Sequence, residues 1–244
     1  MKLKTTIMVL FTSLLFAAGS SLTGCATTGA ERATKATNTM QTVEFDYKQV
    51  SLQVDATNTA LQELINPNQM DMKNALDNYN ANVTKMQKLG KQLNKNTADM
   101  SAQGQNYFSE WEKQGNTYTN PQIRQLSEER RLQLRGAFSQ IPEASVGVKG
   151  SLQSYLADIS EIQKYLSYDL TTKGVEGIAP VAQKAMQDGE GLKTSIQPVL
   201  AAIDHARTAM VQGGANSGAA AGGEQPGDQP QGVPQPEGQQ PEAQ

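Results

Sequence analysis

Apolar residues recur at alternating spacings of three and four through most of the chain, and this pattern restricts the fold to packed helices. We call each such stripe a seam. Four seams are present, over residues 40–64, 72–111, 123–166 and 175–210. No run of β-branched residues alternates with a period of two between hairpin turns, so strands are not expected.

Turn signals separate the four seams. Asn66-Pro67-Asn68 ends the first, because proline cannot continue a helix and disfavours helix in the residue before it. Thr119 or Asn120 is a helix cap, with Pro121 in the first helical position, and the 169–172 turn precedes the last helix. Long helices with short connections pack as antiparallel neighbours.

The sequence therefore predicts an all-α fold, an elongated up-down-up-down helical bundle. Its thin core agrees with a hydrophobic content of only 37%. A parallel oligomeric coiled coil is the alternative, which the turn signals disfavour. Pro142 either kinks one long helix or divides two, whereas Pro180 and Pro198 lie inside a seam that keeps its register, which predicts kinks without breaks.

Residues 1–24 have the pattern of a lipoprotein signal peptide. Lys2 and Lys4 precede a short apolar run over residues 7–19, too short for an ordinary membrane span. The bacterial lipobox, an apolar residue and two small residues before the cysteine that receives the lipid, is matched by Leu22, Thr23, Gly24 and Cys25. Cys25 is the only cysteine of the chain.

A lipid on Cys25 would attach the protein to a membrane, since each buried CH₂ of an acyl chain contributes about 0.8 kcal/mol. The mature chain would then begin at Cys25 and face an extracytoplasmic space of the cell envelope. Ala26 resembles the residue found in lipoproteins sorted to the outer membrane, so we expect a periplasm-facing outer-membrane location where the cell has two membranes.

The regions beside the seams differ from them in composition. Residues 25–38 are small, polar and aperiodic, which predicts a flexible tether. Residues 212–244 are rich in Gly, Pro and Gln and contain no Lys or Arg, which predicts a disordered tail. The helical bundle domain is expected to occupy residues 39–211.

Composition argues against several classes of function. One histidine and one cysteine give no set of metal ligands, and a formal net charge of -3 gives no global case for nucleic-acid binding. His205 is interpreted as an exposed or interfacial polar side chain, and the seam methionines as core packing. Phosphate loops and nucleophile elbows are not found, so no cofactor and no enzymatic activity are expected.

The densest group of charges lies early in the third predicted helix, where arginines alternate with Glu128 and Glu129. The mixed signs favour a solvated helix face. A docking face for anionic lipid or peptidoglycan is the alternative. The residues of this possible interaction face are Arg124, Arg130, Arg131 and Arg135.

The second half of the chain resembles a family of bacterial helical proteins of unknown function, many of them secreted or lipid-anchored. Two motifs carry the resemblance, Phe-x-Glu-Trp-Glu at residues 108–112 and Tyr-Leu-Ser-x-Asp-Leu at residues 165–170. Between them lie Ser127, Arg130 with Arg131, Phe138 and Asp158-Ile159. The resemblance implies a helical fold and an envelope location, but no mechanism.

We therefore expect a non-enzymatic, lipid-anchored envelope protein whose bundle acts as a spacer or adaptor for a protein partner or for a second copy of itself. The alternative is a module that binds the cell wall or a small ligand between its helices. That alternative predicts a pocket where Gly90 and Gly104 thin the core, while Gly90, Gly104 and Gly189 also permit close helix approach.

Overall fold

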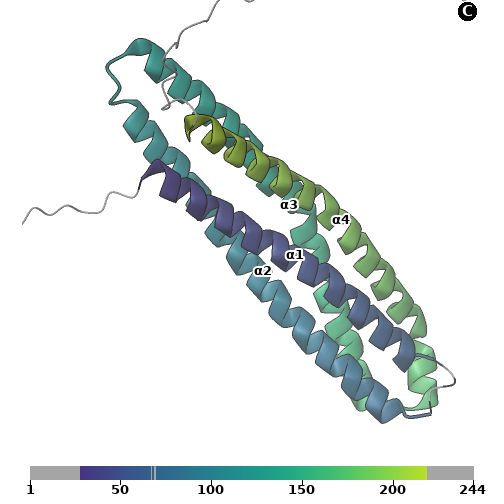
Figure 1. Ribbon diagram of the computed structural model, residues 1–244. Helices are drawn as coiled ribbons and strands as arrows, with labels where there is room; N and C mark the ends of the chain where they lie inside the picture. Colours follow the sequence, from purple (N-terminus) through teal and green to yellow (C-terminus); the bar gives the residue numbers. More distant parts are fainter. Residues whose placement is uncertain (1–27, 67, 69, 219–244) are drawn as a thin grey trace, which may run out of the picture.

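The structure is a computed structural model that describes residues 28–66, 68 and 70–218, of which 212–218 are described by their backbone alone. It consists of four helices, α1 (Gly29–Leu64), α2 (Met72–Gly115), α3 (Pro121–Tyr168) and α4 (Thr172–Gly218) (Figure 1). The described residues contain no strand. The predicted all-α bundle is confirmed.

The start of α1 corrects the predicted tether. Thr28 and Glu31 form a capping box, in which the Glu31 amide donates to Thr28 Oγ1 over 3.2 Å and the Thr28 amide donates to the Glu31 carboxylate over 2.6 Å. Ala36 is fully buried one turn before the seam begins at Met40. The prediction of a flexible tether is therefore wrong for residues 29–38, and residues 25–27 lie outside the described residues.

The end of α4 lies beyond the predicted boundary at residue 211. Its backbone remains helical to Gly218, since extending a formed helix adds one hydrogen bond for each residue fixed. The prediction of disorder is therefore wrong for residues 212–218. The predicted tail over residues 219–244 and the predicted signal peptide over residues 1–24 lie outside the described residues.

The predicted boundaries of α3 and α4 are otherwise confirmed. The side chain of Asn120 caps α3 by accepting from the amides of Gln122 and Ile123, with Pro121 in the first turn. Pro142 lies inside an unbroken α3, and α4 continues through both of its internal prolines. A proline thus removes one hydrogen bond from a long helix here without dividing it.

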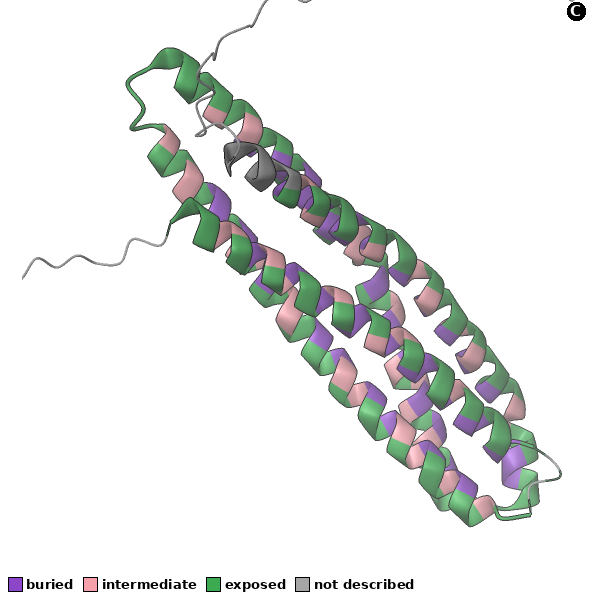
Figure 2. Ribbon diagram, in the orientation of Figure 1, coloured by how far each residue is buried: buried purple, intermediate pink, exposed green. Residues whose placement is uncertain are grey.

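The helices contact one another in the order α1, α2, α3, α4 and back to α1. This order is that of an up-down-up-down bundle, with the buried stripes of all four helices facing inward (Figure 2). The predicted seams form nearly the whole core. The largest fully buried side chains include Tyr79, Tyr155, Leu61, Met86 and Leu166.

The seam glycines allow close helix approach, as predicted. A Cβ atom added at Gly104 would lie 2.2 Å from Cζ of Phe138, and one added at Gly90 would lie 2.9 Å from Cδ1 of Leu156. Gly189 approaches Tyr155 and Val54 in the same way. Neighbouring side chains therefore fill the space at Gly90 and Gly104 themselves, while a surface hollow of about 430 Å³ lies beside Gly104 and includes Gln105, Phe108 and Phe138 in its lining.

A buried polar layer between α1 and α2 was not predicted. The Asp46 carboxylate, almost fully buried, accepts hydrogen bonds from Gln92 Nε2 over 2.7 Å and from Asn96 Nδ2 over 2.6 Å. A second link joins three helices, since the Tyr155 hydroxyl donates to Asn58, whose amide donates to the carbonyl of Met186. Such directional contacts fix the register of helices that apolar seams alone would allow to slide.

One pole of the bundle has a distinct construction. The start of α1, the α2–α3 connection and the last turns of α4 all lie there, and the α2–α3 hairpin extends past the other two (Figure 1). We call residues 113–127, which include the connection and the helix ends that flank it, the hairpin tip. The connections between α1 and α2 and between α3 and α4 lie at the opposite pole (Figure 1).

Candidate functional site at the hairpin pole

The first motif of the family resemblance, residues 108–112, lies at the base of the hairpin tip together with Ser127, Arg131 and Phe138, whereas the second motif, residues 165–170, lies at the opposite pole. Trp111 Nε1 on α2 donates to Ser127 Oγ on α3 over 2.9 Å. Below this bond, the rings of Phe108 and Phe138 pack edge to face with centroids 5.8 Å apart. Two stretches separated in sequence thus form one cluster that fastens α2 to α3.

An ion pair completes the cluster. Arg131 donates to the Glu112 carboxylate over 2.9 Å and lies 3.8 Å from that of Glu128. The whole Arg131 residue is only 8% exposed, so its stem packs in the bundle while its guanidinium meets the glutamates at the surface.

The structure corrects the predicted interaction face of Arg124, Arg130, Arg131 and Arg135. Arg131 is buried, and Arg130 is half-buried and donates to the carbonyl of Ala209 on α4 over 2.6 Å. Arg124 and Arg135 are exposed. The four residues therefore do not form one exposed basic surface, because helical spacing points them in different directions and two of them hold the bundle together.

A cavity of about 510 Å³ lies where α1 begins, beside the hairpin. Apolar and aromatic groups form much of its lining, including Tyr107, Trp111, Leu134 and Met210. Burial raises the pKa of the Tyr107 hydroxyl, while the nearby charge of Arg130 opposes that change. The cavity thus combines a largely apolar lining with arginines, and its wall includes Gly29, the first residue of α1.

Beyond this cavity, the hairpin tip exposes the apolar start of the α3 seam. Ile123 and Leu126 were predicted to be core residues, but they are 48% and 67% exposed, and Tyr118 in the connection is also exposed. The prediction is wrong for these two residues because the first turns of α3 extend past the start of α1 and past the end of α4 (Figure 1).

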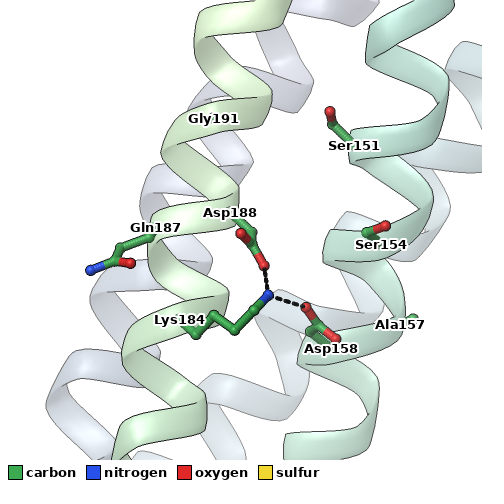
Figure 3. A pocket seen from close by; sticks show the side chains of 8 residues that line it. All are labelled: Ser151, Ser154, Ala157, Asp158, Lys184, Gln187, Asp188 and Gly191. Carbon is green, nitrogen blue, oxygen red and sulfur yellow. Dashed lines mark hydrogen bonds and ion pairs between the residues drawn. The ribbon is translucent and has the colours of Figure 1, made fainter.

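A second surface hollow lies between α3 and α4 and measures about 640 Å³ (Figure 3). Lys184 lies between two carboxylates there, 2.5 Å from Asp188 and 4.0 Å from Asp158. The hydrogen bond that Lys184 donates to Asp188 raises the pKa of Lys184, so its amine remains an ammonium. The hollow is lined with small and polar side chains such as Ser151 and Ser154, and its cation is already neutralised (Figure 3).

The remaining chemical features of the described residues are few. No group of three or more His, Cys, Asp or Glu that could hold a metal ion occurs among them. His205 is exposed, and its Nδ1 lies 3.3 Å from Oε1 of Gln140. Within the part of the chain that the structure describes, none of the helices has the length and apolar character to cross a membrane.

These observations define a class, that of elongated four-helix bundles whose most distinctive surface is one pole. A model of the family described as "Protein of unknown function (DUF2959)" matches residues 31–211, and the chain belongs to that family. Comparisons with curated proteins and with solved structures gave no significant match. The matched region contains the cluster at the base of the hairpin tip.

The exposed surface of the hairpin tip was not predicted from the sequence. One signal for it was available, because residues 113–127 contain Lys113 and Arg124 and not a single Asp or Glu. The signal is not specific on its own, because residues 78–98 also lack Asp and Glu and contain four lysines.

Proposed function

We propose that this protein is a non-enzymatic, lipid-anchored protein of the cell envelope, whose helical bundle acts as a spacer or adaptor for a protein partner. The observation that carries the proposal is the short distance along the chain between the lipobox cysteine and the rigid bundle. Cys25 precedes Gly29, the first residue of α1, by four positions. Four extended residues reach about 14 Å at most.

This short connection gives the anchored bundle a defined polarity. A lipid on Cys25 would hold the hairpin pole close to the membrane and leave the opposite pole away from it. α3 has 48 residues, which at about 1.5 Å per residue gives a helix about 70 Å long. An upright bundle would therefore present its far pole several nanometres from the lipid, as a spacer requires.

The stiffness of the bundle supports the same role. Contacts between helices recur along its length, including the pair of Lys193 on α4 with Asp55 on α1 at 2.5 Å. The hydrogen bond that Lys193 donates to Asp55 raises the pKa of Lys193, as expected for a charged pair between neighbouring helices. A bundle fixed in this way transmits position over its whole length, which suits a protein that sets a distance or presents a binding face.

The proposal places the protein, where a cell has two membranes, on the periplasmic face of the outer membrane, with an envelope protein or a second copy as partner. It assigns no catalytic role. Burial raises the pKa values of Tyr79 and Tyr155, and the hydroxyls of both donate to partners inside the bundle. The strongest pKa shifts thus belong to tyrosines that join the helices.

Cross-linking in living cells tests the proposal. A photoreactive residue replaces Tyr168, the exposed last residue of α3 at the far pole, and cross-linked proteins are identified by mass spectrometry. We expect one specific envelope protein, and its loss in the Cys25→Ala variant. The matched control places the same photoreactive residue at Leu52, an exposed position on the side of the bundle, about three turns of α1 before its end.

Two results would contradict the proposal. If radioactive palmitate labels neither the wild type nor the Cys25→Ala variant, the chain carries no lipid anchor. If the Tyr168 position yields only the products seen at Leu52, the far pole has no dedicated partner. Cross-links between copies alone would instead identify the partner as a second molecule of this protein.

A further inference from the structure

We propose that the hairpin tip, residues 113–127, is a second membrane contact that docks onto the headgroup region of a phospholipid bilayer. The inference rests on the proposed lipid anchor, and it adds a surface that the anchor does not require. It follows from the position of the tip and from its side chains.

The hairpin tip lies at the same pole as the start of α1. The cavity beside α1 is lined both by Gly29 and by Tyr118, so the start of α1 and the α2–α3 connection belong to one pole. The hairpin extends past Gly29 at that pole (Figure 1). A lipid within about 14 Å of Gly29 would therefore bring the bilayer surface to the level of the tip.

The side chains of the tip suit that surface. Tyr118, Ile123 and Leu126 are exposed together, and tyrosine is enriched where proteins meet the membrane–water interface. Arg124 is held at the turn, where its guanidinium donates to the carbonyl of Tyr118 over 2.7 Å and 3.2 Å. The apolar residues match the acyl boundary, and Arg124 matches the phosphates of anionic lipids.

The opposite pole shows that exposure alone does not produce this combination. Met70 and Tyr168 are exposed there, yet the only charged residues of the connections 65–71 and 169–171 are Asp71 and Asp169. The hairpin tip contains Lys113 and Arg124 and no Asp or Glu, and Lys113 is paired with Glu110 just outside it over 2.7 Å. The tip thus offers Arg124 to an anionic lipid surface, whereas the charged residues of the opposite connections are acidic.

A second contact would fix how the bundle stands. A lipid on Cys25 constrains one point, and a single attachment point does not set the direction in which the bundle stands. The tip adds a second point on the same surface. Two contacts at one pole would fix the orientation of the bundle on the membrane. The far pole would then point in one direction, as a spacer requires.

The test compares a fluorescent probe at the two poles of the full-length lipidated protein. Thr119→Cys puts a thiol in the tip, and Tyr168→Cys puts one at the far pole. Each is labelled with an environment-sensitive dye, because the lipid occupies the sulfur of the only native cysteine. The proteins are reconstituted into phosphatidylethanolamine–phosphatidylglycerol vesicles with or without brominated acyl chains.

We expect brominated lipid to quench the tip probe several-fold more strongly than the far-pole probe, with a blue shift at the tip only. If the protein floats with the vesicles but both probes are equally exposed to water, the second contact is wrong while the anchor stands. A tip that instead binds a protein partner would give this result. If the protein does not float with the vesicles, both the anchor and the contact are wrong.

Two matched leucine substitutions test whether the apolar side chains of the tip cause the membrane contact. Leu126 and Leu52 are 67% and 62% exposed on helices, but only Leu126 lies in the tip. Leu126→Glu should reduce quenching of the Thr119 probe several-fold, and Leu52→Glu should leave it unchanged, with circular dichroism confirming that both variants fold. Equal quenching in the two variants would overturn the proposal.

Discussion

The body of the bundle and the hairpin tip are built from the same two helices, yet they bury their seams differently. In the body, α2 and α3 each have two neighbours, and seam residues such as Tyr79 and Ile159 are fully buried. In the tip the same pattern continues at Ile123 and Leu126, and both are exposed. A seam therefore marks the apolar side of a helix, while the number of neighbouring helices decides whether that side is covered.

The boundary between the two regions is sharply built. Phe138 and Gly104 close the body from α3 and α2, and Trp111 with Ser127 joins the helices one step further out. Beyond that point only two helices continue, and two helices cannot enclose a core. The apolar stripe that stabilises the body is therefore exposed in the tip, where it can contact a membrane or a partner.

The largest expected effect separates the two regions within one helix. Leu166→Ala removes a fully buried side chain from the body end of α3 and should cost about 2–5 kcal/mol in the free energy of unfolding. Leu126→Ala, in the tip of the same helix, should change it by less than about 0.5 kcal/mol. Urea unfolding followed by circular dichroism measures both. An equal cost would show that the tip is packed in the free protein.

Glycine substitutions sharpen the comparison at the boundary. Gly104→Ala should destabilise by about 1–3 kcal/mol, because its Cβ would overlap the Phe138 ring. Gly150→Ala should stabilise by about 0.5–1 kcal/mol, because nothing lies within 4 Å of a Cβ there and alanine favours helix.

Thermal unfolding checks the signs of the two glycine effects. Adding Phe138→Leu to Gly104→Ala should recover part of the loss by removing ring atoms from the overlap. A loss unchanged by that second substitution would place the strain elsewhere, and the boundary would not be held by this contact.

Much of the fold could be predicted from the sequence, because seam and cap signals are local. The 3–4 spacing predicted all four helices, and the Asn120-Pro121 pair predicted the start of α3. The start of α1 was missed although its capping box is equally local, because the small residues after it show no periodicity. Ala36 is buried in spite of this, since a small side chain fits where helices approach closely.

The candidate site was harder to predict, because it depends on which helix ends lie together. Exposure of Leu126 follows from the relative ends of α1, α3 and α4, which no local pattern records. The buried bonds of Asp46 likewise depend on the alignment of α1 with α2. The motif residues Trp111 and Ser127 were noticed in the sequence, but only the structure shows that they touch.

The smallest expected effect concerns the ion pair between Glu44 and Arg207 in the body of the bundle. Glu44 on α1 meets Arg207 on α4 and Lys48 on its own helix, the latter at 2.6 Å. The hydrogen bond from Lys48 and the neighbouring positive charges lower the pKa of Glu44 below 4.5, against the opposing effect of its partial burial. A carboxylate with a lowered folded-state pKa stabilises the fold above its unfolded pKa, and that contribution is lost as the pH falls through the folded value.

Glu44→Gln should therefore cost about 0.5–1 kcal/mol at pH 7, a magnitude near the upper end for pairs that water still screens. The cost should shrink as the pH falls below 4.5 and vanish once wild-type Glu44 is protonated, because both side chains are then neutral. Glu161→Gln, on the exposed face of α3, is the control. Urea unfolding at a series of pH values gives the difference, and a cost that stays constant down to pH 2 would mean that shape, not charge, makes Glu44 important where α1 meets α4.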